Sequence, residues 1–360
     1  MRYNNKSYLR WILFAGSLCP ISIPLLSFDL SLERVIVPII AIYLILSFLF
    51  NEEIENNFIL HKYTGLSFLI TFIIISFSLF FIDFQNMGLP IRLLYNLVSG
   101  YIIYILFTFI YDTDLQKPEY FIFSAIIISL IFYLYNSFSI SRMAFISKII
   151  SRDELGVNPN SILNSVAFLL IINQLYIIKN STFYTNALQM IFVVICSFQF
   201  SRQNLVSGIF LIIHSVRKNK YFLYLSILSI IFIFYRFDLR IFSYILKGVT
   251  QISGQTESTR LEWWTASLDH IINYPYFPRF TVPVDNTLLT LLLHTGLIFG
   301  IVAIIIIFIA LIRIGSLSLP ILFSLMTLFI LNDVLYEASF WFIVFSSLDS
   351  RIIKYRNLES

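Results

Sequence analysis

The charged residues of this chain are absent from long stretches of its sequence, and their absence limits what the chain can fold into. Charged residues make up 12% of the 360 residues, whereas a soluble domain carries about 25%. A helix needs about 20 mostly apolar residues to cross a bilayer. Twelve apolar segments without Asp, Glu, Lys or Arg come near that length, some only with their uncharged flanks: 11–28, 35–50, 64–82, 93–111, 120–138, 161–178, 183–200, 203–216, 221–235, 287–312, 316–331 and 338–348. The sequence therefore predicts a polytopic membrane protein.

These segments favour helices over the strands of a barrel. Inside a bilayer every backbone polar group needs an internal partner, which leaves helices and closed barrels. Barrel strands alternate in polarity over about 10 residues, whereas these segments are longer and apolar on all sides. We expect an all-α fold: one integral membrane domain over residues 1–360, a transmembrane helical bundle of about 12 spans. Arg2, Lys6 and Arg10 precede the first segment, as cations precede the apolar part of a signal peptide. Because further spans follow, this segment is interpreted as an uncleaved span.

The orientation of the bundle follows from its positive clusters. Lys and Arg accumulate in short loops on the cytoplasmic side. The clusters at 2–10, 217–220 and 351–356 all fall on one side when the number of spans is even. The sequence therefore predicts cytoplasmic N- and C-termini. It also predicts an extracytoplasmic loop at 139–160 and a long one at 236–286.

Nearly half of the 24 Lys and Arg residues then lie outside, where the topology rule disfavours them. Arg142 and Arg152 belong to the first loop, Arg202 precedes a span, and Arg260 and Arg279 belong to the second loop. Arginine binds phosphate through two parallel hydrogen bonds and stays charged in a low dielectric. For any single residue, a solvated loop charge is the preferred interpretation. For the set, we favour an anion site at the outer membrane face.

The long loop has internal order. Residues 257–272 predict a short amphipathic helix, with Arg260, Trp264 and Leu268 on one face. Trp264 has two interpretations, stacking on a sugar ring and anchoring in the membrane interface. Prolines then force an extended segment that leads to Asp285 at the mouth of the next span.

Two polar residues mark that next span. Asn286 could orient Asp285 or bind sugar, or it could simply cap the helix. His294 lies inside the span. A single histidine there is more often a helix-packing hydrogen bonder, although ionisable groups within a membrane are functional by default.

Together these residues carry a family resemblance. The series Arg260-x-x-x-Trp264, a Pro-containing turn, Asp285-Asn286-x-x-Leu289, and Gly296 with Gly300 resembles the signature of the O-antigen polymerase and ligase family. The pairs Ser201-Arg202 and Asn158-Pro159-Asn160 also match its pattern. The motifs cover roughly residues 156–312, and their order and spacing are more specific than any single one.

The resemblance implies a polytopic, GT-C-like glycosyltransferase at the outer face of the bacterial plasma (inner) membrane. Polymerases of the family join oligosaccharide repeats carried on undecaprenyl pyrophosphate into O-antigen or capsule polysaccharide. Ligases transfer the finished glycan to lipid A-core, and they usually carry His where this chain has Asp285, which favours the polymerase. The implied partners are the undecaprenyl-pyrophosphate-linked oligosaccharide, membrane lipid and a chain-length regulator protein. Nucleic acid is not an expected partner, because the net charge is only +4.

The mechanism we expect uses Asp285 as general base, with Arg260 and Arg202 stabilising the departing pyrophosphate. The expected substrate-binding residues are Arg279, Arg152, Arg142, Trp264, Asn286 and His294. No cofactor is expected, and no metal, since no His and Cys cluster has ligand spacing. Asp112 and Asp114 form an Asp-x-Asp pattern on the predicted cytoplasmic side and are interpreted as solvated loop charge.

Two other functions stay open at this point. A lipid-linked oligosaccharide flippase would need charged or polar residues lining a cavity within the spans, and the charge-free spans count against it. The O-antigen ligase shares the chemistry and differs in its acceptor.

Overall fold

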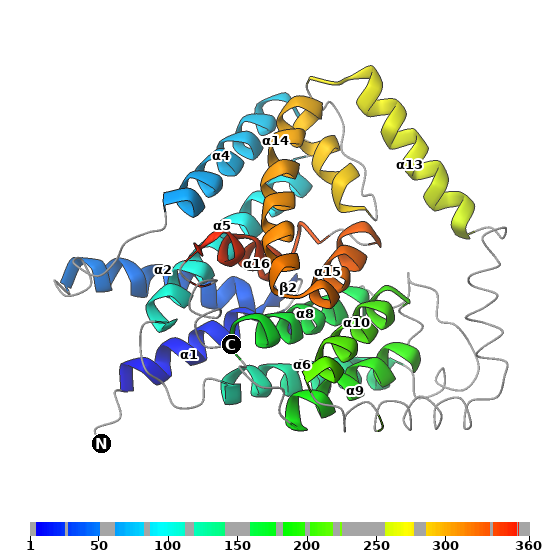
Figure 1. The fold of residues 1–360 in the computed structure, drawn as a ribbon. Coiled ribbons are helices and arrows are strands. Elements are labelled where there is room, and N and C mark those ends of the chain that lie inside the picture. The colour runs from blue at the N-terminus through cyan, green and yellow to red at the C-terminus, as the bar shows by residue number, and fades with distance from the viewer. Residues whose placement is uncertain are drawn as a thin grey trace. The chain divides into compact units, whose positions relative to one another are not determined.

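The chain is helical, as the computed structural model in Figure 1 shows. The structure describes residues 5–25, 28–50, 62–82, 87–111, 119–140, 159–177, 183–198, 202–218, 224, 256–276, 286–331, 334–350 and 352, and the structural statements below refer to these. The longer helices are α1 (Asn5–Ser17), α2 (Leu32–Phe50), α4 (Lys62–Ser78), α5 (Gly88–Tyr111), α6 (Glu119–Ile140), α8 (Pro159–Ile172), α9 (Phe183–Phe198), α10 (Arg202–Lys218), α13 (Thr256–Asn273), α14 (Thr287–Leu317), α15 (Leu319–Leu331) and α16 (Ala338–Leu348). A 3-10 turn η1 (Leu79–Phe81) and a π-helical turn η4 (Asn173–Ile177) extend α4 and α8. The prediction of a helical chain is confirmed.

Four described helices are long and apolar enough to cross a membrane: Leu32–Leu49, Lys62–Phe81, Gly88–Ile110 and Thr287–Leu317. Six shorter apolar helices coincide with further predicted segments: Tyr120–Leu134, Ile162–Tyr176, Tyr184–Cys196, Gln203–Val216, Leu319–Ile330 and Ala338–Leu348. The segment 221–235 lies outside the described residues except for Tyr224. Membrane character is therefore supported by length and composition, and the bundle of about 12 spans stays a prediction.

The first predicted span is wrong as a continuous helix. Helix α1 ends at Ser17, and the chain then forms an antiparallel hairpin of β1 (Ser22–Leu25) and β2 (Phe28–Ser31), with Ser22 opposite Ser31. Pro20 explains the break, because a proline disfavours helical backbone in the residue before it. Hydropathy alone did not reveal this, since the charge-free run continues to Phe28.

By its internal contacts the chain divides into two compact units. The first comprises Met1–Phe68, Asn96–Leu188 and Glu337–Ser360, and the second comprises Leu69–Tyr95 and Gln189–Tyr336. The interpretation of residues 1–360 as one membrane domain stays a prediction, and each unit is described here by itself.

Helix α16 is the core element of the first unit. All of its residues are buried, as expected for a helix that is apolar on every side. The ring of Phe342 lies 5.3 Å from Phe14 of α1 and 5.4 Å from Phe107 of α5, between ring centroids. Gly100 of α5 faces Trp341, and any Cβ at Gly100 would collide with it. Close backbone approach therefore places α5 against α16.

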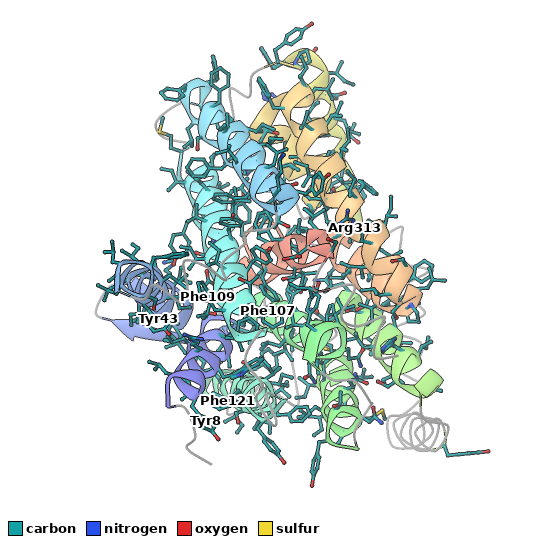
Figure 2. All side chains as sticks on the ribbon, turned by 60° about the vertical axis from the view of Figure 1, so that its left-hand side comes forward. Tyr8, Tyr43, Phe107, Phe109, Phe121 and Arg313 are labelled. Carbon is teal, nitrogen blue, oxygen red and sulfur yellow. The ribbon has the colours of Figure 1, made fainter. Side chains whose placement is uncertain are left out.

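Polar contacts tie other helices of this unit together. Arg10 Nε donates to the Tyr43 hydroxyl at 2.7 Å. Its guanidinium carbon lies 5.9 Å from the Tyr43 ring centroid and 6.0 Å from that of Phe109, and Figure 2 shows the two rings near each other. At the end of α16, the fully buried Asp349 accepts a hydrogen bond from the Tyr104 hydroxyl at 2.7 Å. These pairs satisfy groups that an apolar interior would otherwise penalise.

In the second unit α10 packs along α15, and α15 along α14 (Figure 1). Ser207 and Ser324 share a hydrogen bond of 2.6 Å across α10 and α15. His214 Nδ1 of α10 lies 2.7 Å from Ser318 Oγ, between α14 and α15. Small hydroxyls and a histidine thus join helices whose surfaces are otherwise apolar.

Candidate functional site

The site is built around a sharp bend in α14, visible in Figure 1 as two arms of one helix. The bend lies at Gly296, whose φ of 75° and ψ of 169° are not helical. A Cβ at this position would lie 2.6 Å from the Tyr276 carbonyl oxygen. Only glycine fits such backbone angles and such a close approach. The first arm, Thr287–Thr295, therefore runs in a different direction from the rest of α14.

The segment that follows α13 is attached to this bend. The Leu297 amide donates to the Pro275 carbonyl oxygen at 2.7 Å, where an uninterrupted helix would use a carbonyl four residues back. Helix α13 itself packs on the first arm, since Ile271 forms a buried cluster with Leu289 and Leu293. The described part of the long predicted loop, residues 256–276, is thus held against the first arm and the bend of α14.

A helix, α13, spans Thr256–Asn273 in the segment predicted as that loop, and the extracytoplasmic loop itself stays a prediction. Trp264, Ser267 and Ile271 form its packed face, while Leu268 is exposed. Trp264 is half-buried against the cluster with α14, and its indole Nε1 is buried with no hydrogen-bond partner among the described residues. Packing is therefore one role of Trp264.

The first arm of α14 carries a buried polar face. Thr287, Thr290 and His294 are fully buried, and their spacing places them on one side of a helix. Asn286 caps the arm, because its Oδ1 accepts from the Leu289 amide at 3.1 Å. The alternative that Asn286 acts as an N-cap is therefore confirmed as one of its roles.

Ile330, Val334 and Tyr336 contact this first arm and its cap. Asn286 Nδ2 donates to the Ile330 carbonyl oxygen at 3.1 Å, and the Val334 amide donates to Thr287 Oγ1 at 3.2 Å. The Tyr336 hydroxyl lies 2.6 Å from His294 Nε2. One hydrogen bond thus joins the cap residue to the end of α15, and two join Val334 and Tyr336 to the arm.

A cation completes this arrangement. The guanidinium carbon of Arg92, in the first turns of α5, lies 5.3 Å from the centroid of the Tyr336 ring. Arg92 is exposed, Tyr336 is half-buried and His294 is fully buried. His294 Nδ1 is buried and has no hydrogen-bond partner among the described residues. The chain of contacts runs from an exposed cation through an aromatic ring to a buried imidazole.

Such an arrangement can bind an anion. A guanidinium that stacks on an aromatic face is oriented by it, and its N–H groups point outward in the plane. The ring beneath it is fixed by a hydroxyl that is itself hydrogen bonded. The described geometry therefore supplies a positive charge at the protein surface beside an aromatic ring, with a buried imidazole behind that ring.

The structure brings together only part of the predicted site. Asn286, His294 and Trp264 belong to one packed region of α13 and α14. Four predicted residues lie outside the described residues: Asp285, Arg279, Arg152 and Arg142. Arg260 belongs to α13 and Arg202 opens α10, and their side chains are also outside the description. Their roles stay predictions.

Sequence reasoning did not single out Arg92 or Tyr336 as site residues. Arg92 directly precedes the apolar segment 93–111, and Tyr336 lies between the last two predicted spans. Their one sequence signal is an arginine on the side that the topology rule disfavours. No local pattern connects two residues so far apart in the chain.

Among the residues that the structure describes, no group of three or more His, Cys, Asp or Glu could hold a metal ion. The expectation of a metal-independent site stays a prediction. Comparisons of the chain with protein-family models, with curated proteins and with solved structures found no match.

Proposed function

We propose that this protein is a glycosyltransferase that polymerises undecaprenyl-pyrophosphate-linked oligosaccharide repeats into O-antigen or capsule polysaccharide. It works at the outer face of the bacterial plasma membrane. In this proposal the chain crosses the membrane about 12 times and keeps both termini in the cytoplasm. No metal or cofactor takes part.

One observation carries the proposal. Of the family-like series, Trp264 lies on α13, Asn286 and Leu289 lie at the first arm of α14, and these two elements pack together. Trp264 packs on that arm, Asn286 caps it, and Gly296 forms the bend to which the segment after α13 is hydrogen bonded. A series of weak motifs that converges in space supports a site better than the same motifs spread along a chain.

The proposed reaction is a transfer with inversion. A hydroxyl of the acceptor repeat attacks the anomeric carbon of the donor sugar, and the bond from that carbon to the pyrophosphate oxygen breaks. The bonding pair leaves with the pyrophosphate, and the hydroxyl proton passes to the Asp285 carboxylate. Arg260 and Arg202 stabilise the charge on the leaving group, and removing one such group costs on the order of 10²–10³ in rate.

The remaining residues hold the substrates. Arg279, Arg152 and Arg142 bind phosphate oxygens. Trp264 and Asn286 bind sugar beside the loop, with His294 behind them. The ligase uses the same chemistry with lipid A-core as acceptor, and the presence of Asp285 where ligases usually carry His favours the polymerase.

Deletion of the gene separates the candidate functions. Loss of a polymerase leaves single repeats attached to the surface acceptor, loss of a ligase leaves long chains on the carrier, and loss of a flippase leaves units inside the cell. We expect single repeats, and we expect the wild-type gene to restore the ladder. A full ladder after deletion would contradict the proposal.

Point variants then test the site. Asp285→Asn and Arg260→Ala are expected to remove the ladder, whereas Arg313→Ala, a cation at the other end of α14, is the matched control and keeps it. All three should reach the membrane in wild-type amounts. If Asp285→Asn and Arg260→Ala both keep a normal ladder, the site assignment is wrong even though the deletion result stands.

A further inference from the structure

The arrangement of Arg92, Tyr336 and His294 has a role of its own. We propose that Arg92 is a further substrate-binding residue, which binds phosphate oxygens of the lipid-linked pyrophosphate. Tyr336, fixed by His294, is the positioning residue that orients the guanidinium. The identity of the lipid rests on the proposed function; the binding of a lipid-borne phosphate rests on the geometry.

The stacking distance is the first argument. With its central carbon 5.3 Å from the Tyr336 centroid, the Arg92 guanidinium lies within the range of a cation–π contact. A ring beneath one face of the plane restricts the guanidinium, and a phosphate is bound through its edge. Arg92 is exposed, so an anion can reach it from outside.

The rigidity of the ring is the second argument. The Tyr336 hydroxyl contacts His294 Nε2 at 2.6 Å, and His294 is fully buried. Two residues earlier, the Val334 amide is bonded to Thr287. The ring is thus held from its tip by a side chain and from its backbone by the same helical arm. A binding group supported in this way needs little reordering when its ligand arrives.

The place of Arg92 along α5 is the third argument. Leu93 directly after it is fully buried, and the rest of α5 carries no charge. A cation at the end of an apolar span lies near the level of the lipid headgroups, which is where a lipid-borne pyrophosphate is. In the proposed orientation this is the outer end, where the topology rule disfavours arginine, so binding of an anion gives a reason for its presence.

Binding of a soluble analogue tests the proposal directly. The probe is farnesyl pyrophosphate, titrated by calorimetry against the full-length protein in phosphatidylcholine nanodiscs. Loss of hydrogen bonds to a charged group is expected to raise the Kd of Arg92→Ala by about 10- to 100-fold. Arg92→Lys should recover only part of the affinity, because the ammonium cannot make the paired contact. Arg313→Ala is the matched control and should bind as wild type does.

The positioning role of Tyr336 needs a separate readout. Tyr336→Phe keeps the ring and should retain most of the affinity, whereas Tyr336→Leu should weaken binding. In the double variant Arg92→Ala/Tyr336→Leu, the second change should add almost nothing, because its effect passes through the guanidinium. A purely structural tyrosine would instead give additive losses of affinity in the double variant.

Three results would overturn the proposal: no binding of farnesyl pyrophosphate by the wild type, an Arg92→Ala affinity equal to wild type, or additive losses in the double variant. A second arm uses nanodiscs that contain phosphatidylglycerol. If Arg92→Ala reduces only retention of that lipid, the bound phosphate is a bulk headgroup and the assignment to the substrate is wrong. These outcomes are independent of the gene deletion, so failure of this proposal and failure of the polymerase function are distinguishable.

Discussion

The two arms of α14 have similar apolar sequences and different surroundings. In the first arm, Thr287, Thr290 and His294 are fully buried against neighbouring segments of the protein. In the second arm, Ile301, Ile305 and Ile312 are exposed along one side, with the spacing of a helical stripe. The bend at Gly296 separates them. Hydropathy therefore identifies α14 as a helix, whereas the buried hydroxyls and imidazole distinguish its first arm as the candidate site.

The exposed stripe fits contact with lipid. In a soluble protein, a row of large exposed aliphatic side chains would be a liability, but hydrocarbon around the second arm removes that cost. The first arm instead forms hydrogen bonds with Val334 and Tyr336 and packs against α13. We therefore expect the arms to respond differently to the same kinds of substitution.

The largest effect is expected at the bend. Gly296→Val forces a β-branched residue into backbone angles that cost about 1–3 kcal/mol for residues other than glycine, and its Cβ would also meet the Tyr276 carbonyl oxygen. The segment after α13 should detach, with loss of thermal stability and of the polysaccharide ladder. Gly88→Ala is the control, because no atom lies within 4 Å of its Cβ position. If Gly296→Val unfolds at the same temperature as the wild type, the bend does not depend on glycine.

A charged side chain in the second arm should disfavour membrane insertion. Ile305 is 51% exposed in the middle of that arm. Ile305→Arg should disfavour insertion by about 2.5–3.5 kcal/mol, the cost of an arginine at the centre of a spanning helix. Insertion can be measured by glycosylation mapping in microsomes. Ala266→Arg, at an exposed residue of α13, should leave insertion unchanged. Equal effects of the two substitutions would contradict the assignment of the second arm to lipid contact.

A smaller loss is expected for the buried polar face. His294→Leu fills the same space with an apolar side chain and removes the imidazole that contacts the Tyr336 hydroxyl. We expect the free energy of unfolding to fall by about 1–3 kcal/mol. Ile305→Leu on the second arm should be near neutral. Thermal unfolding of the purified protein compares the two. If both variants match wild type, His294 has no structural importance in the first arm.

The smallest effect concerns pH. Burial lowers the pKa of His270 in α13 below its ordinary value of 6.5, so the folded state favours the neutral ring. The stability associated with the neutral His270 ring is fully present above about pH 6.5 and is lost as the pH falls toward the lowered pKa. The acidic residues of α13 are Glu257, Glu262 and Asp269, and the first arm of α14 contains no Asp, Glu, Lys or Arg.

We expect His270→Gln to reduce the drop in unfolding temperature between about pH 7.5 and about pH 5.5. A variant with the same drop as wild type would show that other groups cause it.

Much of the helical layout could be predicted from the sequence, because charge exclusion and apolar length are local properties. The helix at 257–272 and the cap at Asn286 also followed from local pattern. The hairpin at 22–31 was missed, because the charge-free run continues to Phe28 and the signals of a break, Pro20, Pro24 and Asp29, are scattered. Local apolar character therefore locates segments better than it locates their ends.

The site was only partly predictable. His294 and Asn286 were candidates because polar residues stand out in an apolar span. Arg92 and Tyr336 were missed, because the contact that joins them depends on how α5 and the turn after α15 meet in three dimensions. Gly296 was noted as part of a motif, but its role at the bend follows from its positive φ and from the carbonyl oxygen of Tyr276.

Reconstitution tests the central claim most directly. The purified protein in nanodiscs is supplied with undecaprenyl-pyrophosphate-linked repeat units and a chelator, and the products are measured by mass spectrometry. We predict carrier-linked chains of two and more repeats, together with free undecaprenyl pyrophosphate, and no such products from Asp285→Asn. Only single repeats from well-folded wild-type protein would contradict it.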